Sequence, residues 1–200
     1  MEGIRFTATN GFPQMEAYNG STDFTAVPYT LRNKCDGIGQ AVHFFLNDYS
    51  FRDAVWCNLE MTTISLCKFD YVFTPDFSLW RDLPSEFPNK EEIYRTRLVG
   101  CYWQQCGFNV IPTASWGGLQ SFPYCLEGLP ERSVIAVSGM GSQKNSDAFN
   151  LWCHGLRFLE AEKSPTLIIV YGPRILVPDL HTPVKFIPDY ISTHFRNGNK

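Results

Sequence analysis

The sequence predicts an α/β fold built on a mostly parallel β-sheet. Five short apolar runs rich in β-branched residues are separated by segments with helical spacing. Two of these runs, residues 134–137 (VIAV) and 167–170 (LIIV), are hydrophobic throughout, as strands covered on both faces must be. Right-handed crossovers between such strands give either a partial (β/α) barrel or an open doubly wound sheet, and the pattern leaves both open.

The strands are expected where apolar runs meet turn residues. In chain order these are residues 41–46, 71–75, 108–116, 133–139 and 166–172. The helices between them are expected at residues 51–68, 89–107, 121–129 and 146–164. Ser50, Asn89 and Ser121 stand where N-caps would begin three of these helices, and Gly107 stands where the second would end. Apolar residues four apart, such as Phe51, Val55 and Leu59, support the first helix.

The chain divides into a core and two flanking segments. Residues 1–40 are rich in Gly, Asn, Thr and Pro and are expected to form an irregular arm or a short hairpin. Residues 41–172 carry the alternating core, and residues 173–200 are expected to be an irregular segment that packs on it. A length of 200 residues and a mass of 22.8 kDa suit one domain with extensions.

Composition narrows the functional classes. A hydrophobic content of 44% with 15% aromatic residues excludes wholesale disorder. A net charge of −3 gives no bulk support for a nucleic-acid partner. No apolar run reaches the roughly 20 residues that span a bilayer, and the N-terminus has no signal-peptide pattern. Seven cysteines without a CxxC pair are therefore expected to be reduced structural thiols in a cytoplasmic protein.

Polar residues follow the expected strands, at the edge where parallel α/β folds place their sites. We name Asp48, Asp76 and Ser115 as candidate catalytic residues, since paired carboxylates can divide acid and base roles or hold a metal ion. The candidate ligand-binding residues after the same strands are Ser78, Asp82, Trp116, Ser138, Lys144 and Tyr171.

Each candidate has a plainer interpretation. Asp and Ser after a strand are also ordinary caps and turn residues, and Asp82 is as well explained by an ion pair with Arg81 or Arg97. Residues 138–144 (SGMGSQK) contain two glycines and a lysine before a helix, but they do not match the phosphate-binding GxxxxGK[ST] pattern. No spacing joins any two of the four histidines into a zinc motif, and His43 is expected to be a core residue. We assign no metal ligands and no cofactor.

The order and spacing of these segments resemble a family known only as domain of unknown function 4417. The resemblance lies in AVHFFLNDYSF, YVFTPDFSLWRDLP, RTRLVGCYWQQCGFNVIPTASWG, SFPYCLEGLPERSVIAVSGMG and PTLIIVYG, and it covers about residues 40 to 172. It implies a protein of phages and mobile genetic elements, and no established activity. Two departures are Asn47, where the family often has an acidic residue, and Trp80, where it often has Tyr. The family's characteristic residues map onto Asp48, Asp76, Ser78, Asp82, Pro84, Asn89, Arg95, Arg97, Trp103, Pro112, Ser115, Trp116, Ser121, Gly128, Ser138, Tyr171 and Gly172.

Three hypotheses of function follow. The first is a strand-end cleft that binds a small polar ligand such as a nucleotide, with catalysis left open. The second is a non-enzymatic protein that binds or inhibits a host factor, which the many aromatic residues would support. The third is a nucleic-acid-associated protein, which would use the basic residues Lys185, His194, Arg196 and Lys200.

Overall fold

The structure is a computed structural model that describes residues 3–189. Its strands form two four-stranded sheets, and every strand pair is parallel. The α/β prediction is therefore confirmed. The first sheet has the order β1 (Thr25–Pro28), β2 (Gln40–His43), β3 (Tyr71–Phe73) and β4 (Asn109–Ile111). The second has the order β5 (Thr113–Ala114), β6 (Val134–Ser138), β7 (Leu167–Tyr171) and β8 (Val184–Ile187).

The two sheets meet at Pro112, which divides one run of chain into β4 and β5. Proline has no N–H to give to a ladder, so a break in the strand falls naturally there. On one side the N–H of Thr74 donates to the carbonyl of Ile111 at 3.0 Å. On the other side the N–H of Ala136 donates to the carbonyl of Pro112 at 2.8 Å. The expected strand at residues 108–116 is thus present, but it serves two sheets.

A cluster of buried side chains fills the space between the two sheets. Its side chains come from strands of both sheets and from the segments beside them, so the sheets face each other across a shared interior. Within residues 3–189 no ladder joins β1 to β8, the two outer strands. This arrangement is that of a partial barrel, one of the two architectures the sequence allowed. The buried members are Tyr18, Ala41, Phe45, Phe73, Ile111, Val134, Ala136, Ile169, Tyr171 and Ile187.

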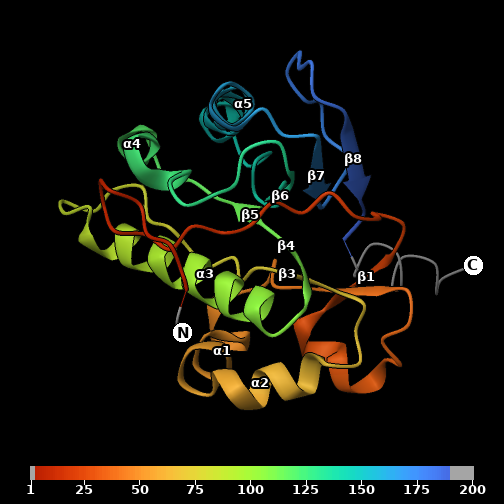
Figure 1. Cartoon of the computed structure of the whole chain (residues 1–200). Helices are drawn as coiled ribbons and strands as arrows, with labels where there is room; N and C mark the ends of the chain where they lie inside the picture. The colour runs from red at the N-terminus through yellow and green to blue at the C-terminus, as the bar shows by residue number, and fades with distance from the viewer. Residues whose placement is uncertain (1–2, 190–200) are drawn as a thin grey trace, which may run out of the picture.

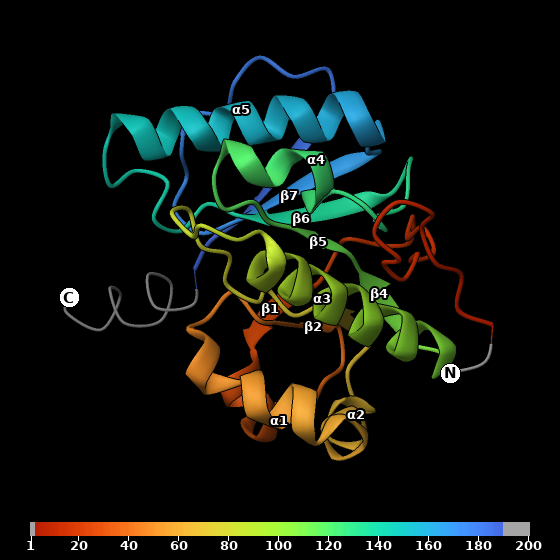
Figure 2. The same ribbon diagram turned by 90° about the vertical axis from the view of Figure 1, so that its left-hand side faces the viewer.

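The helices cover the outside of the sheets, as Figures 1 and 2 show. The α4 and α5 helices lie over the second sheet, and α1 and α2 lie over the first. The α3 helix lies outside the junction of β4 and β5. The α-helices are α1 (Arg52–Cys57), α2 (Leu59–Leu66), α3 (Phe87–Gln105), α4 (Phe122–Cys125) and α5 (Ser146–Lys163). Three 3-10 helices are η1 (Tyr29–Lys34), η2 (Asp48–Ser50) and η3 (Leu119–Ser121).

The structure corrects several details of the predicted helices. The helix expected at residues 51–68 is two helices, divided at Asn58, whose backbone is not helical (φ −132°, ψ 49°). Ser50 lies in η2 and does not cap α1. Ser121 makes no capping hydrogen bond either, because its hydroxyl donates to the carbonyl of Gly118 at 2.7 Å. The expected end of α3 is confirmed, since Gly107 adopts a left-handed φ of +86° just beyond it.

Both flanking segments contain a strand that the sequence did not predict. The N-terminal segment, expected to be an irregular arm or a short hairpin, includes β1, which pairs in parallel with β2, and the expected irregular closing segment includes β8. The rest of the arm runs along the amino ends of the strands, where the N–H of Val134 donates to the carbonyl of Tyr18 at 2.8 Å. The side chain of Thr166, just before β7, donates to Asn19 at 2.7 Å. The arm therefore closes the end of the barrel opposite the carboxyl ends of the strands.

His43 lies in the core, and the cysteines are divided between the core and the surface. His43 is fully buried at the end of β2, and burial lowers the pKa of its imidazole to about 3, which keeps it neutral. Its Nδ1 accepts the N–H of Phe45 at 3.3 Å, and its ring centroid lies 4.2 Å from that of Tyr171. All seven cysteines lie within the described residues and are free thiols. Within residues 3–189 no helix is long and apolar enough to cross a membrane.

Candidate functional site

The loop between β3 and α3 forms one wall of the candidate site, and it is held from three sides. The carboxylate of Asp48 accepts hydrogen bonds from the N–H of Ser78 at 3.2 Å and from its hydroxyl at 2.7 Å. The side chain of Asn89, on α3, brackets Trp80 by accepting its N–H at 2.9 Å and donating to its carbonyl at 2.8 Å. The side chain of Gln120, on η3, donates to the carbonyl of Arg81. Asn89 lies inside α3 and uses its side chain to hold the backbone of Trp80, so it is not the N-cap that the sequence suggested.

Asp48 is part of an ion-pair network behind this wall. Its carboxylate pairs with Arg52, one helical turn later, at 2.6 Å. Arg52 also pairs at 2.8 Å with Glu92, whose side chain is only 5% exposed, and Glu92 pairs with Arg95 at 3.0 Å. Burial and these partners fix the direction in which Asp48 points, toward the backbone of Ser78. Asp48 therefore positions the loop after β3.

The opposite wall begins at the end of β5 with Ser115 and Trp116. Trp116 packs directly on Gly155 of α5: a Cβ added there would lie 2.0 Å from its ring. Only glycine leaves room for this contact. On the same helix, Trp152 donates its indole N–H to the carbonyl of Ser138 at 2.8 Å. The helix α5 thus fixes two aromatic side chains beside the ends of β5 and β6.

The loop from β6 to α5 completes the site. The N–H of Gly139 donates to the carbonyl of Tyr171 at 2.8 Å, which ties the loop to the end of β7. Gly141 turns the loop with a left-handed φ of +75°, and the methylene chain of Lys144 lies beside it. Asn145 is the N-cap of α5, and its side chain accepts the N–H of Ala148 at 2.8 Å.

These three segments enclose a pocket of about 430 Å³ at the carboxyl ends of β3, β5 and β6. Its volume lies within the usual range of small-molecule sites. Charged and hydroxyl-bearing side chains share the lining with aromatic and aliphatic ones. The polar lining residues are Asp76, Ser78, Arg81, Ser115, Ser138, Ser142, Lys144 and Asn145. The larger apolar ones are Phe77, Leu79, Trp116, Met140 and Trp152.

Asp76 has the most perturbed acidity in this lining. Burial of its carboxyl raises the pKa from 3.8 to about 7, and the nearby charge of Asp48 adds to the increase. A hydrogen bond from Ser115 opposes the shift by favouring the ionised form. Part of the Asp76 side chain remains accessible from the pocket. This carboxyl therefore holds a proton more readily near neutral pH than an ordinary aspartate does, and it can either donate or accept one.

The structure brings six of the nine predicted site residues into the pocket lining. They are Asp76, Ser78, Ser115, Trp116, Ser138 and Lys144. The other three lie outside it. Asp48 is behind the loop wall, Asp82 is exposed on the loop beyond Arg81, and Tyr171 faces the barrel interior. Asp82 forms no ion pair with Arg81 or Arg97; the guanidinium of Arg97 instead donates to three backbone carbonyls.

Sequence reasoning missed Arg81, Asn145 and Trp152 as lining residues. Arg81 lies in the loop after the second expected strand, residues 71–75, and no pattern shows where that loop turns. Trp152 lies one turn beyond Ala148 on the α5 face that meets β6, a spacing that could have been read from the helix. Within residues 3–189 no group of three or more His, Cys, Asp and Glu side chains is placed to hold a metal ion. The basic candidates His194, Arg196 and Lys200 lie outside the described residues.

Comparison with known proteins identifies the family. The model of the family described as "Domain of unknown function (DUF4417)" matches residues 6–186, and the chain belongs to this family. The match is wider than the expected 40–172 and includes most of the N-terminal segment and half of the C-terminal one. It thereby corrects the expectation that those segments fall outside the family.

Two curated relatives come from phages. The chain is 39% identical to the "Gene 1 protein" of Mycobacterium phage D29 over 153 residues, 76% of this chain and 56% of that protein. It is 37% identical to the "Gene 1 protein" of Mycobacterium phage L5 over 153 residues, 76% of this chain and 66% of that protein. The chain thus spans between about half and two thirds of the length of these relatives. No solved structure matches.

Proposed function

We propose that this member of the DUF4417 family binds a small polar ligand in the strand-end pocket and exchanges a proton with it through Asp76. The observation that carries the proposal is the position of Asp76, whose carboxyl lines the pocket with a pKa of about 7 and a hydrogen bond from Ser115. Perturbed carboxyls in clefts are characteristic of functional sites. The pocket is large enough for a ligand of nucleotide size.

Acid–base chemistry is the reaction type that these residues support best. A carboxyl that titrates near pH 7 can deliver a proton to a leaving or carbonyl oxygen, or remove one from a bound hydroxyl. Ser115 keeps the carboxyl oriented, and Ser78 is fixed nearby by Asp48. We assign Asp76 as the catalytic group of this proposal, Ser115 as a ligand-contacting residue, and Asp48 as a positioning residue.

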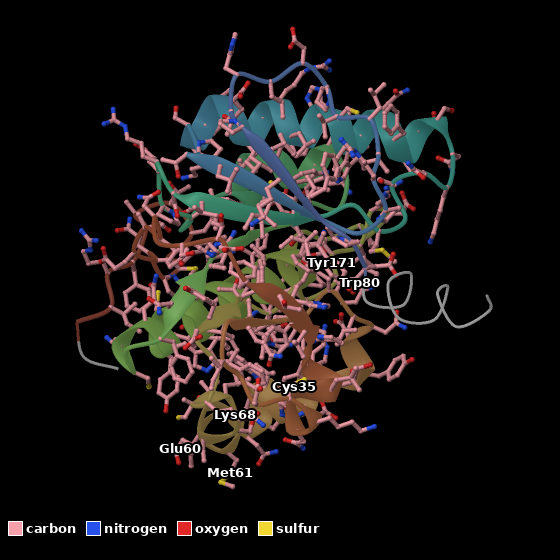
Figure 3. All side chains as sticks on the ribbon, turned by 90° about the vertical axis from the view of Figure 1, so that its right-hand side faces the viewer. Cys35, Glu60, Met61, Lys68, Trp80 and Tyr171 are labelled. Carbon is pink, nitrogen blue, oxygen red and sulfur yellow. The ribbon has the colours of Figure 1, made fainter. Side chains whose placement is uncertain are left out.

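The rival hypothesis, a protein that binds a host factor, loses part of its support in the structure. The sequence argument for it was the abundance of aromatic residues, and much of that aromatic content lies in the core clusters. Trp103 is fully buried and Trp152 is 6% exposed, whereas Trp80 is 43% exposed. Figure 3 shows Trp80 well separated from Glu60 and Met61, which belong to the first turn of α2. The third hypothesis, nucleic-acid binding, rests partly on residues that the structure does not describe.

We place this function in the cytoplasm of the bacterial host cell. Seven unpaired thiols suit a reducing compartment, and the curated relatives are phage proteins.

Native mass spectrometry of the protein purified from bacterial cells tests the proposal. The wild type should retain a small-molecule adduct, or acquire one from a nucleotide and sugar-phosphate mixture, and Asp76→Asn should lose it. The matched control is Asp82→Asn, which removes an exposed carboxylate from the same loop and should retain the adduct. An unliganded mass for the wild type under all conditions would contradict the proposal and favour a host-protein partner.

A further inference from the structure

The charges that line the pocket do not balance. Two cations, Arg81 and Lys144, face one carboxyl, that of Asp76. Within residues 3–189 neither Arg81 nor Lys144 forms an ion pair. By contrast, Arg52 and Arg95 behind the wall are both paired with Glu92. The pocket therefore has an excess of one positive charge when Asp76 is ionised and of two when it is protonated.

The two cations come from opposite walls. Arg81 belongs to the loop between β3 and α3, where Gln120 and Asn89 hold the backbone on either side of it. Lys144 belongs to the loop between β6 and α5, beside the turn at Gly141. Concave surfaces lined by one sign of charge concentrate ligands of the opposite sign. An anionic group bound between these walls would be contacted from both.

We propose that the ligand carries a phosphate group, which binds between Arg81 and Lys144, while Asp76 and Ser115 contact a hydroxyl or amino group of the same molecule. This inference rests on the proposed function and specifies its ligand class. Two cations and one protonated carboxyl match a dianion, and a phosphate monoester is mainly dianionic at pH 7 because its second pKa is about 6. The guanidinium of Arg81 can contact two phosphate oxygens at once, whereas Lys144 contributes a point charge.

The apolar lining agrees with a ligand of this kind. Trp116, which is partly exposed, offers aromatic surface in the same pocket. Such surface suits the sugar or base of a nucleotide. The side chain of Trp116 is held against Gly155, so the surface is already formed before the ligand binds.

Phosphate binding should also be linked to protonation of Asp76. A dianion in the pocket adds negative charge near the carboxyl of Asp76, whose pKa burial already raises to about 7, so its binding favours the protonated form. A phosphate monoester is already mainly dianionic above pH 7, so its binding should take up a proton and weaken as pH rises from 7 to 8. A ligand held only by apolar contacts would show neither effect.

The experiment uses inorganic phosphate, ribose 5-phosphate and adenosine 5′-monophosphate, with uncharged adenosine as the comparison. Binding is followed by intrinsic fluorescence, to which Trp116 and Trp152 in the lining contribute, and by calorimetry in two buffers that differ in ionisation enthalpy. We expect at least one phosphate compound to bind, adenosine to bind at least about tenfold more weakly than its monophosphate, and binding to take up a proton.

Charge-removing variants locate the phosphate. Lys144→Met and Arg81→Met should each weaken binding of the phosphate compound by at least about tenfold. The control Lys34→Met removes an exposed lysine of η1 outside the lining and should bind as the wild type does.

Three results would overturn the inference. The first is failure of all three phosphate compounds to bind below about 10 mM. The second is binding that neither cation variant weakens. Equal binding of adenosine and its monophosphate, lost in Asp76→Asn, would refute the phosphate while leaving the proposed function intact. An unliganded mass for the wild type under all conditions of the mass-spectrometry test would refute the proposed function itself.

Discussion

Replacing Asp76 with Asn should remove the loss of folding stability that the ionisation of Asp76 causes as pH rises. Burial, assisted by the charge of Asp48, raises the pKa of the Asp76 carboxyl from 3.8 to about 7. The folded protein therefore binds a proton that the unfolded chain has released, and ionising Asp76 costs free energy in the fold. At about 1.36 kcal/mol for each pKa unit, the full cost is roughly 4 kcal/mol. It is absent below about pH 4 and complete above about pH 7, and water reaching the side chain through the pocket makes it an upper value.

The measurement is urea unfolding of wild type and Asp76→Asn at pH 5, 6, 7 and 8, followed by tryptophan fluorescence. The free energy of unfolding of the variant, minus that of the wild type, should increase by about 2.5 kcal/mol from pH 5 to pH 8. Any constant difference in packing or hydrogen bonding with Ser115 cancels in this comparison. Asp82→Asn is the control, and its difference from the wild type should change little because its carboxylate is exposed. Parallel curves for wild type and Asp76→Asn would refute the electrostatic description of the site.

Three further predictions test the walls of the pocket and the thiols. Gly155→Ala should lower the free energy of unfolding by about 1 to 3 kcal/mol and weaken ligand binding, because its new methyl group displaces Trp116; denaturation and the fluorescence titration measure both. Asn89→Ala should cost about 1 to 3 kcal/mol and speed hydrogen exchange at the N–H of Trp80, whereas Asn109→Ala, at the exposed start of β4, should leave that exchange unchanged. A thiol reagent should label three cysteines rapidly in the native protein, and mass mapping should find them to be Cys57, Cys67 and Cys106; rapid labelling of buried Cys101, Cys125 or Cys153 would contradict the fold.

The sequence predicted the strands that are buried on both faces and missed those at the edges. The β6 and β7 strands are nearly continuous in hydrophobic residues because helices cover one side and the barrel interior covers the other. The β1 strand is four residues long and ends at Pro28, and only its last two residues are buried. The β8 strand contains Lys185, whose side chain reaches the carbonyl of Thr22. Short, half-polar edge strands of this kind carry little hydrophobic signal.

Helix boundaries were harder to predict because they depend on contacts between distant residues. Asn89 resembles an N-cap in sequence, but its amide is used to hold the backbone of Trp80 on the preceding loop. The break at Asn58 interrupts a segment whose apolar spacing continues across it. The local pattern is compatible with one long helix across Asn58 and with a helix that begins after Asn89. Contacts with distant residues determine the observed boundaries.

The sequence alone places a polar residue at the carboxyl edge of the sheet, but the direction of its side chain depends on the strand. A polar residue just beyond a parallel strand lies at the correct edge, and this placed Asp76, Ser115 and Ser138 together. Whether the residue faces the pocket depends on the alternation of side chains along the strand. Ile168 and Val170 pack in the core beneath α4 and α5, so Tyr171 shares the opposite face, toward the barrel interior, with Ile169. That alternation could have removed Tyr171 from the candidates.

The two carboxylates could be distinguished only in part. Asp48 precedes Arg52 by four residues, a spacing that already indicates an ion pair when a helix follows. Glu92, which holds the other side of the same guanidinium, lies forty residues away from it, a contact that only the fold creates. Arg52 pairs with Asp48, whereas Asp76 has no cationic partner among the described residues and has its pKa raised to about 7 by burial. The difference between the two acids therefore comes from the placement of one arginine, and moving that charge should change the acidity of Asp76: in Arg52→Met, Asp48 loses its partner and the pKa of Asp76 should rise further.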